Sequence, residues 1–220
     1  MSKAKNKILV IDYGVGNDQS IINALHFLGY DFSVSSKKDD ILHASVLILP
    51  GVGAFGEAMK NLHDLKIIDV IKNQVLKEKK PLLGICLGFQ VLADWSEENG
   101  FHKGLGLISG KVLKLKSQKS LRIPHVGWNT ITITKKNPLF SKVDNHASFY
   151  FDHSYHFLCD TSYISAQCLY GKPIAAAIQK DNIFGVQFHP EKSQNNGLKL
   201  FRSFFDSLGI KPTRPAKKHA

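Results

Sequence analysis

The chain lacks the features that mark membrane-spanning and disulfide-rich proteins. Its 220 residues contain no apolar run of the roughly 18 residues that a transmembrane helix needs. The N-terminus leads straight into a hydrophobic segment without the layout of a signal peptide. Cysteine is scarce, and Cys86, Cys159 and Cys168 form neither a paired framework nor a metal-ligand spacing. We therefore expect a cytoplasmic chain without a membrane contact, a disulfide framework or a metal site.

Acidic side chains are also few. The 18 Asp and Glu stand against 29 Lys and Arg, which gives a formal charge of +11 at pH 7. Such an excess can indicate a nucleic-acid partner, because clustered Lys and Arg release counterions when they neutralise phosphates. Here the lysines are spread along the chain, mostly in loops and at the ends of predicted elements, where a solvent-exposed surface is the ordinary interpretation. This distribution argues against nucleic-acid binding.

The pattern of apolar residues predicts one α/β domain. Apolar residues make up 43% of the chain, enough for one substantial core over residues 1–210, followed by a disordered tail at 211–220. Short β-rich runs alternate with amphipathic segments in the first half, which predicts a mostly parallel sheet with helices on both faces. The second half adds an antiparallel β extension. The predicted strands are 7–12, 32–35, 46–49, 105–115, 130–134, 149–157, 174–179 and 183–188, and the predicted helices are 20–28, 57–62, 67–77 and 197–208.

The most informative stretch is Gly-Ile-Cys-Leu-Gly at residues 84–88, at a predicted strand-to-helix junction. Flanking glycines suit a nucleophile on a sharp turn with strained backbone and close neighbouring segments. On such a turn the Cys86 sulfur projects beside the positive end of the next helix, which favours the thiolate. The alternative is a small buried hydrophobe, the usual state of a free cysteine. The glycines favour the reactive interpretation for Cys86, whereas the buried one stands for Cys159 and Cys168.

A thiol nucleophile needs a base and a group that orients the base. Among the 10 histidines, His189 stands out because it ends a predicted buried strand, with Glu191 two positions later. Positions i and i+2 of an extended chain point the same way, so Glu191 can accept from one ring nitrogen while the other faces the thiol. A capped strand end with a solvated carboxylate is the alternative.

Acyl transfer also needs donors for the oxyanion that develops on the substrate. The backbone N–H of Leu87, at the start of the predicted helix, is one candidate. The Pro-Gly-Val-Gly loop at residues 50–53 offers others at Val52 and Gly53, because no bulky side chain shields its amides. The loop could equally be a tight connection between a strand and a helix.

Together, these three motifs resemble the class I (triad) glutamine amidotransferases. Within that class the resemblance is strongest to the glutaminase subunits of imidazole glycerol phosphate synthases. It implies a flavodoxin-like fold, attack of Cys86 on the glutamine amide, proton transfer by His189 and orientation of the imidazole by Glu191. No cofactor is implied. The motifs that carry this resemblance lie at residues 12–17, 20–29, 50–55, 84–90, 96–98, 104–107, 124–129, 149–151, 153–155 and 187–191.

The resemblance further implies that Gln90, Glu98, Ser154 and Tyr155 hold the substrate glutamine. Each has a plainer alternative. Gln90 could be a polar residue on a helix surface, Glu98 part of a solvated acidic pair, and the other two could pack at a strand end. A lone polar residue rarely identifies its ligand, so these assignments depend on the family likeness.

Family members of this kind work with a (β/α)8-barrel partner in histidine biosynthesis. The ammonia joins a ribulosyl-linked aminoimidazole precursor and gives imidazole glycerol phosphate with a carboxamide by-product. By resemblance, Asn17 and Trp128 face the partner, which switches the glutaminase on by re-aiming a backbone amide in the loop at 50–53. Asp18 and Asp152 depart from the family pattern, in which apolar residues are usual, and they bear on the identity of the partner.

Three other functions are alternatives to this one. Close paralogues in surface-polysaccharide clusters supply ammonia for converting a sugar acetamido group to an acetamidino group, and the residues leave that alternative open. A catalytically silent binding module is disfavoured because Cys86, His189 and Glu191 are all present. A stand-alone cysteine hydrolase would not need Gln90 together with the Pro-Gly-Val-Gly loop.

Overall fold

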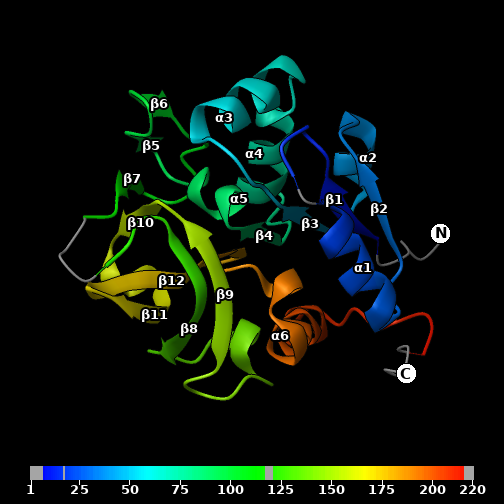
Figure 1. Cartoon of the computed structure of the whole chain (residues 1–220). Helices are drawn as coiled ribbons and strands as arrows, with labels where there is room; N and C mark the ends of the chain where they lie inside the picture. Colours follow the sequence, from blue (N-terminus) through cyan, green and yellow to red (C-terminus); the bar gives the residue numbers. More distant parts are fainter. Residues whose placement is uncertain (1–6, 17, 117–120, 216–220) are drawn as a thin grey trace.

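The structure is a computed structural model that describes residues 7–16, 18–116 and 121–215 (Figure 1). Nine of the strands described form one sheet in the order β2-β1-β3-β4-β13-β12-β11-β8-β9, and four form a second sheet in the order β10-β7-β5-β6. The strands are β1 (Ile8–Ile11), β2 (Phe32–Ser35), β3 (Val46–Leu49), β4 (Leu82–Ile85), β5 (Trp95–Ser96), β6 (His102–Lys103), β7 (Gly110–Lys114), β8 (His125–Ile133), β9 (Ser148–His153), β10 (Tyr155–Cys159), β11 (Ile164–Tyr170), β12 (Lys172–Lys180) and β13 (Ile183–Val186).

Helices cover both faces of the parallel part of the large sheet, as predicted (Figure 1). Strand β1 shows how one strand serves two cores, because Ile8 and Val10 pack with α1 and α6, whereas Leu9 and Ile11 pack with α3 and α4. A strand buried on both faces is the expected state in a helix-covered parallel sheet. The helices are α1 (Asp18–Leu28), α2 (Lys38–His43), α3 (Phe55–Asp64), α4 (Ile68–Leu76), α5 (Leu87–Gln90) and α6 (Gln194–Ser207).

The predicted antiparallel extension is present. Strands β12, β11, β8 and β9 follow β13 in antiparallel pairs. The predicted hairpin joins β12 to β13, with Lys180 opposite Ile183 and a positive φ of 51° at Asp181 in the turn. The α/β fold class predicted from the sequence is therefore confirmed.

Some local predictions are wrong. The strand predicted at 149–157 is split at Ser154, because β9 belongs to the large sheet and β10 to the small one. In the strand predicted at 105–115, only β7 is extended. The backbone N–H groups of Leu105 and Leu107 instead bond to the carbonyls of Val91 and Leu92, at 2.8 and 2.9 Å. Helix α2 and strand β11 were not predicted, and β8 begins at His125 rather than at residue 130.

The described part of the chain beyond residue 210 contacts Gly29, which follows α1. Both Thr213 and Arg214 donate backbone hydrogen bonds to the Gly29 carbonyl, at 2.8 and 3.2 Å. Residues 216–220 lie outside the described ranges, so the division into a domain and a tail stays a prediction. Within the described ranges, no helix has both the length and the apolar character needed to cross a bilayer.

The topology gathers three predicted motifs at one edge of the sheet. The loop at residues 50–53 follows β3, Cys86 follows β4, and His189 comes shortly after β13. These strands are parallel neighbours in the order β3-β4-β13. Since the carboxyl ends of parallel strands share an edge, segments far apart in the sequence meet there.

Candidate active site

Cys86 sits on a strained turn between β4 and α5. Its φ of 53° and ψ of −107° lie in a region that side-chain-bearing residues rarely adopt. The flanking glycines make the turn possible, since a Cβ at Gly88 would lie 1.8 Å from the Leu49 carbonyl oxygen. At Gly84 it would lie 2.7 Å from the Gly88 oxygen. Both positions therefore exclude any larger residue.

The helix after Cys86 is shorter than the sequence suggests. Helix α5 is a single turn over Leu87–Gln90, and a single turn contributes little macrodipole. The helix dipole predicted to act at Cys86 is therefore weak.

His189 lies between the thiol and a carboxylate. Its Nδ1 is 2.7 Å from Glu191 Oε1, and both side chains are only 2% exposed. Burial alone would lower the pKa of His189, but the negative charges of Cys86 and Glu191 outweigh burial and raise that pKa to about 10. At neutral pH the imidazole thus keeps its proton. Glu191 reaches the ring from a 3-10 turn (Pro190–Lys192), not from the extended chain that was predicted.

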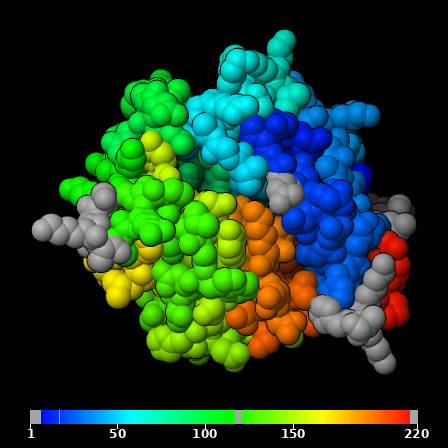
Figure 2. Space-filling view, in the orientation of Figure 1, coloured from blue at the N-terminus to red at the C-terminus, as the bar shows by residue number. Residues whose placement is uncertain are grey.

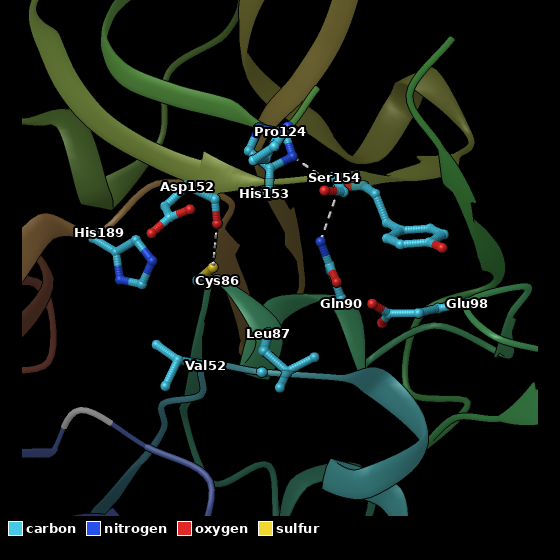
Figure 3. Close-up of a pocket in the computed structure, with 12 residues that line it drawn as sticks. Val52, Cys86, Leu87, Gln90, Glu98, Pro124, Asp152, His153, Ser154 and His189 are labelled. Carbon is cyan, nitrogen blue, oxygen red and sulfur yellow. Dashed lines mark hydrogen bonds between the residues drawn. The ribbon is translucent and has the colours of Figure 1, made fainter. Parts of the chain in front are cut away.

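The sulfur also contacts the far wall of the site. Cys86 Sγ is 3.8 Å from the Asp152 carbonyl oxygen, a contact drawn as a dashed line in Figure 3, and 3.9 Å from Gln187 Nε2. Fully buried Gln187 also accepts a hydrogen bond from Gln90 Nε2, at 3.1 Å. Gln187 was missed as a site residue, although it stands in the quoted motif two positions before His189.

One pocket of about 250 Å³ brings the predicted residues together. Figure 2 shows a recess between the cyan surface of α3 and the yellow-green surface near residue 150. The space is below the usual volume of drug-sized ligand sites and suits a small molecule. Glu191 lies outside this lining, behind His189. The lining consists of Val52, Gly53, Cys86, Leu87, Gln90, Glu98, Pro124, Asp152, His153, Ser154, Tyr155 and His189.

The predicted substrate-binding residues are held in place by the backbone. Gln90 Nε2 donates to the Tyr155 carbonyl at 2.9 Å, a bond drawn in Figure 3. Glu98 Oε2 accepts from the Phe55 N–H at 2.8 Å, which ties the carboxylate to the first residue of α3. Ser154 occupies the break between β9 and β10, so the split strand that the sequence did not predict forms part of the pocket wall.

The oxyanion side of the pocket is not assembled in the same way. The Leu87 N–H, one predicted donor, is occupied by a hydrogen bond to the Gly51 carbonyl at 3.3 Å. In a planar trans peptide the N–H points opposite to the C=O. The Val52 N–H, which belongs to the same peptide unit, therefore points away from Leu87. In this arrangement two of the predicted donors cannot converge on one oxygen.

Strands β8 and β9 present aromatic and apolar groups beside the pocket. Trp128 is 50% and Val126 is 55% exposed. They lie opposite Tyr150 and Asp152 of β9, respectively. Lys192 Nζ lies 5.7 Å from the Tyr150 ring centre. Asn17, predicted to face a partner with Trp128, lies outside the described residues.

A buried histidine pair, His153 in the pocket lining and His125 bonded to it, was also missed. His153 Nδ1 lies 2.8 Å from the Tyr155 carbonyl, and its Nε2 is 2.9 Å from His125 Nδ1. Burial lowers the pKa of His125 to about 4. Burial is also the main reason why the pKa of His153 is lowered to about 3. Both rings are therefore neutral at pH 7, and the carbonyl contact assigns the Nδ1–H tautomer to His153. The motif at 124–129 contained His125 but gave no signal of this contact.

The comparisons with known proteins agree with this geometry. The family model for glutamine amidotransferase class-I matches residues 9–208. The chain belongs to the class-I glutamine amidotransferase family. It is therefore a glutamine amidotransferase, as the sequence motifs indicated.

Curated relatives of this amidotransferase share nearly half of its residues. It is 47% identical over 197 residues to the imidazole glycerol phosphate synthase subunit HisH 1 of Campylobacter jejuni strain RM1221, which covers 90% of this chain and 98% of the relative. It is 48% identical over 205 residues to the subunit HisH 2 of Vibrio vulnificus strain YJ016, with 93% and 96% covered.

Solved structures share the fold at lower identity. The structure of PurLQS from Thermotoga maritima aligns with a TM-score of 0.72 at 21% identity, over 93% of this chain and 99% of that one. A structure described as a glutamine amidotransferase aligns with a TM-score of 0.72 at 20% identity, covering 92% and 99%. At this identity the likeness supports the fold alone.

Proposed function

We propose that this chain is the glutaminase subunit of an imidazole glycerol phosphate synthase. The observation that carries the proposal is the single pocket in which Cys86 and His189 meet Gln90, Glu98 and Ser154. The high identity to two HisH subunits over nearly their whole length supports the choice within the family.

The contacts support a defined chemical sequence. The Cys86 thiolate attacks the side-chain amide carbon of glutamine, and its carbonyl oxygen becomes the oxyanion. His189 gives its proton to the departing nitrogen, which leaves as ammonia and a γ-glutamyl thioester on Cys86. His189 then takes a proton from water, the hydroxide adds to the thioester, and glutamate leaves as the thiol is restored. Glu191 keeps the imidazole oriented at Nδ1 throughout.

The proposed substrate contacts follow from charge and position. The carboxylate of Glu98 complements the α-ammonium group of glutamine, while its bond to Phe55 fixes it. Gln90 and Ser154 provide further polar groups in the pocket lining. A pocket of about 250 Å³ favours a free amino acid over a peptide.

The partner surface is proposed to be the exposed face of β8 and β9. Trp128 is a large, half-exposed aromatic of the kind that anchors interfaces. Asp152 lines the pocket and pairs in register with exposed Val126, so this face is continuous with the site. A (β/α)8-barrel subunit docked there, with Asn17 in the same contact, would receive ammonia directly.

The same proposal includes activation by that partner. As it stands, the Gly51 carbonyl occupies the Leu87 N–H. Rotation of the Gly51–Val52 peptide would withdraw that carbonyl and turn the Val52 N–H toward the oxyanion. Loss of one oxyanion donor costs about 10²- to 10³-fold in kcat. We therefore expect partner binding to raise glutamine hydrolysis by about that factor.

The test combines the chain with the barrel subunit, the aminoimidazole precursor and either glutamine or an ammonium salt. Wild type should make imidazole glycerol phosphate from both nitrogen sources. Cys86→Ala should use only the ammonium salt, because the cyclase does not need the thiol. Glutamate release without this product would move the assignment to another ammonia-consuming partner such as the sugar amidotransferase. No glutamate release by wild type would refute the glutaminase itself.

A further inference from the structure

Tyr13 contacts the loop at residues 50–53, here named the oxyanion loop. It follows β1 and is 3% exposed, and its hydroxyl donates to the Pro50 carbonyl at 2.6 Å. Pro50 is the first residue of the loop that carries Val52. The hydrogen bond joins segments 37 residues apart and is itself buried. The sequence motif at 12–17 contains Tyr13 but does not indicate a role for it.

The hydroxyl is a permanent donor. Burial raises the pKa of Tyr13 far above its usual value, and the negative charges of Asp18 and Cys86 raise it further. The phenol therefore keeps its proton across the working pH range of an enzyme. The same charges show that Tyr13 lies within electrostatic reach of the nucleophile.

Tyr13 also leaves no room around Gly51. A Cβ at Gly51 would come within 2.5 Å of the Tyr13 hydroxyl oxygen, 2.9 Å of Leu87 Cβ and 3.0 Å of the Gly88 nitrogen. Tyr13 thus fixes the Pro50 carbonyl on one side of Gly51. Leu87 holds the Gly51 carbonyl on the other side. Two successive carbonyls of the loop have separate donors.

We propose that Tyr13 is a positioning residue that anchors the base of the oxyanion loop. The inference depends on the proposed glutaminase function. With Pro50 held by Tyr13, rotation is confined to the Gly51–Val52 peptide, because only the bond from Leu87 must break. The Val52 N–H then arrives at one defined place. Without the anchor the whole loop shifts, and the donor is misplaced relative to the oxyanion.

The test is Tyr13→Phe, which removes one oxygen and keeps the ring. In the complex with the barrel subunit, kcat for glutamine hydrolysis should fall about 10- to 100-fold, the scale of a misplaced catalytic donor. KM should stay within about twofold, because the contacts of Gln90 and Glu98 are untouched. The matched control is Tyr30→Phe, another buried tyrosine, which packs on Phe205 on the opposite face of the sheet. It should leave both constants within about twofold.

A second measurement separates positioning from folding. Alkylation of Cys86 by iodoacetamide should proceed at the wild-type rate in Tyr13→Phe, which shows an intact fold and nucleophile. Unchanged kcat in Tyr13→Phe would overturn the inference, as would equal losses in Tyr13→Phe and Tyr30→Phe. Both results presuppose a wild-type protein that turns over. A wild type without turnover refutes the proposed function instead.

Discussion

The two sides of the pocket differ in how complete they are. On one side Cys86, His189 and Glu191 are within reach of one another, and the imidazole is charged at neutral pH. On the other side the Leu87 N–H is already bonded to the Gly51 carbonyl. The triad side chains are in position, whereas the Gly51–Val52 peptide does not present its N–H to the pocket. The proposed activation would therefore act through backbone rotation, without moving a catalytic side chain.

Removing the catalytic base, on the side of the pocket that holds the triad, should lower turnover the most. His189→Asn takes away the proton carrier, and loss of a triad base costs about 10⁴-fold or more in kcat. Glutamate release measured in the partner complex should fall by at least that factor. His43→Asn changes an exposed histidine of α2 and serves as the control. Turnover within tenfold of wild type would show that another group moves the proton.

Displacing the oxyanion loop, on the other side of the pocket, should lower turnover by a smaller factor. Gly51→Ala places a methyl group 2.5 Å from the Tyr13 hydroxyl, so the loop must move and the donor is lost. We expect about a 10²-fold fall in the partner-activated kcat. Alkylation of Cys86 by iodoacetamide should stay within about threefold of wild type.

The control for this variant is Gly209→Ala. An added Cβ there meets nothing within 4 Å, although the positive φ of 70° makes it strained. It should cost stability and leave turnover unchanged. If Gly51→Ala turned over like this control, the loop would not supply the oxyanion donor.

A third variant should change substrate affinity and leave both the triad and the oxyanion loop as they are. Glu98→Gln removes the charge proposed to face the α-ammonium of glutamine, while an amide oxygen can still accept from Phe55. KM for glutamine should rise about tenfold with kcat within about twofold, the cost of one charge-assisted hydrogen bond. The neighbouring Glu97→Gln is the matched control, because Glu97 bonds to the Lys114 N–H outside the pocket. Equal KM values in the two variants would remove Glu98 from the substrate site.

The smallest effect concerns stability and pH. Burial lowers the pKa of His156 to about 4, as it does for His125, whereas the unfolded value is near 6.5. Between these values the unfolded chain binds more protons, so stability falls as pH drops from about 6.5 toward 4. His189 has the opposite sign: its contribution is full below about 6.5 and is lost as pH rises through about 10.

Thermal unfolding measured at pH 7.5 and pH 5 checks this prediction. Wild type should have the lower melting temperature at pH 5. His156→Leu, which removes one of the buried neutral rings, should show a smaller drop between the two pH values. An identical drop would show that His156 is not a source of the acid sensitivity.

The sequence predicted the triad side of the pocket better than the oxyanion loop. Cys86 between glycines and His189 at a strand end are recognisable because residue type and strand position define their chemistry. The orientation of the Gly51–Val52 peptide depends on ψ of Gly51, which glycine leaves free, and on φ of Val52, so no residue pattern encodes it. Only the hydrogen bond from Leu87 reveals it.

Other errors have the same physical origin in tertiary contacts. The apolar run that includes Leu105 and Leu107 resembles a strand by composition, but its N–H groups bond to carbonyls after α5. Gln187 and the pair His125 and His153 have no spacing that distinguishes them from ordinary strand residues. Their roles follow from neighbours that only the folded chain supplies.

The most direct test compares nucleophile reactivity with turnover when the barrel subunit is added. The chain for this experiment carries Cys159→Ser and Cys168→Ser, so that iodoacetamide reports Cys86 alone. We predict that glutamine hydrolysis rises by about 10²- to 10³-fold while the alkylation rate of Cys86 changes by less than about threefold. If alkylation rose in step with turnover, the partner would be activating the sulfur, and the division between a finished triad and an unfinished oxyanion site would be wrong.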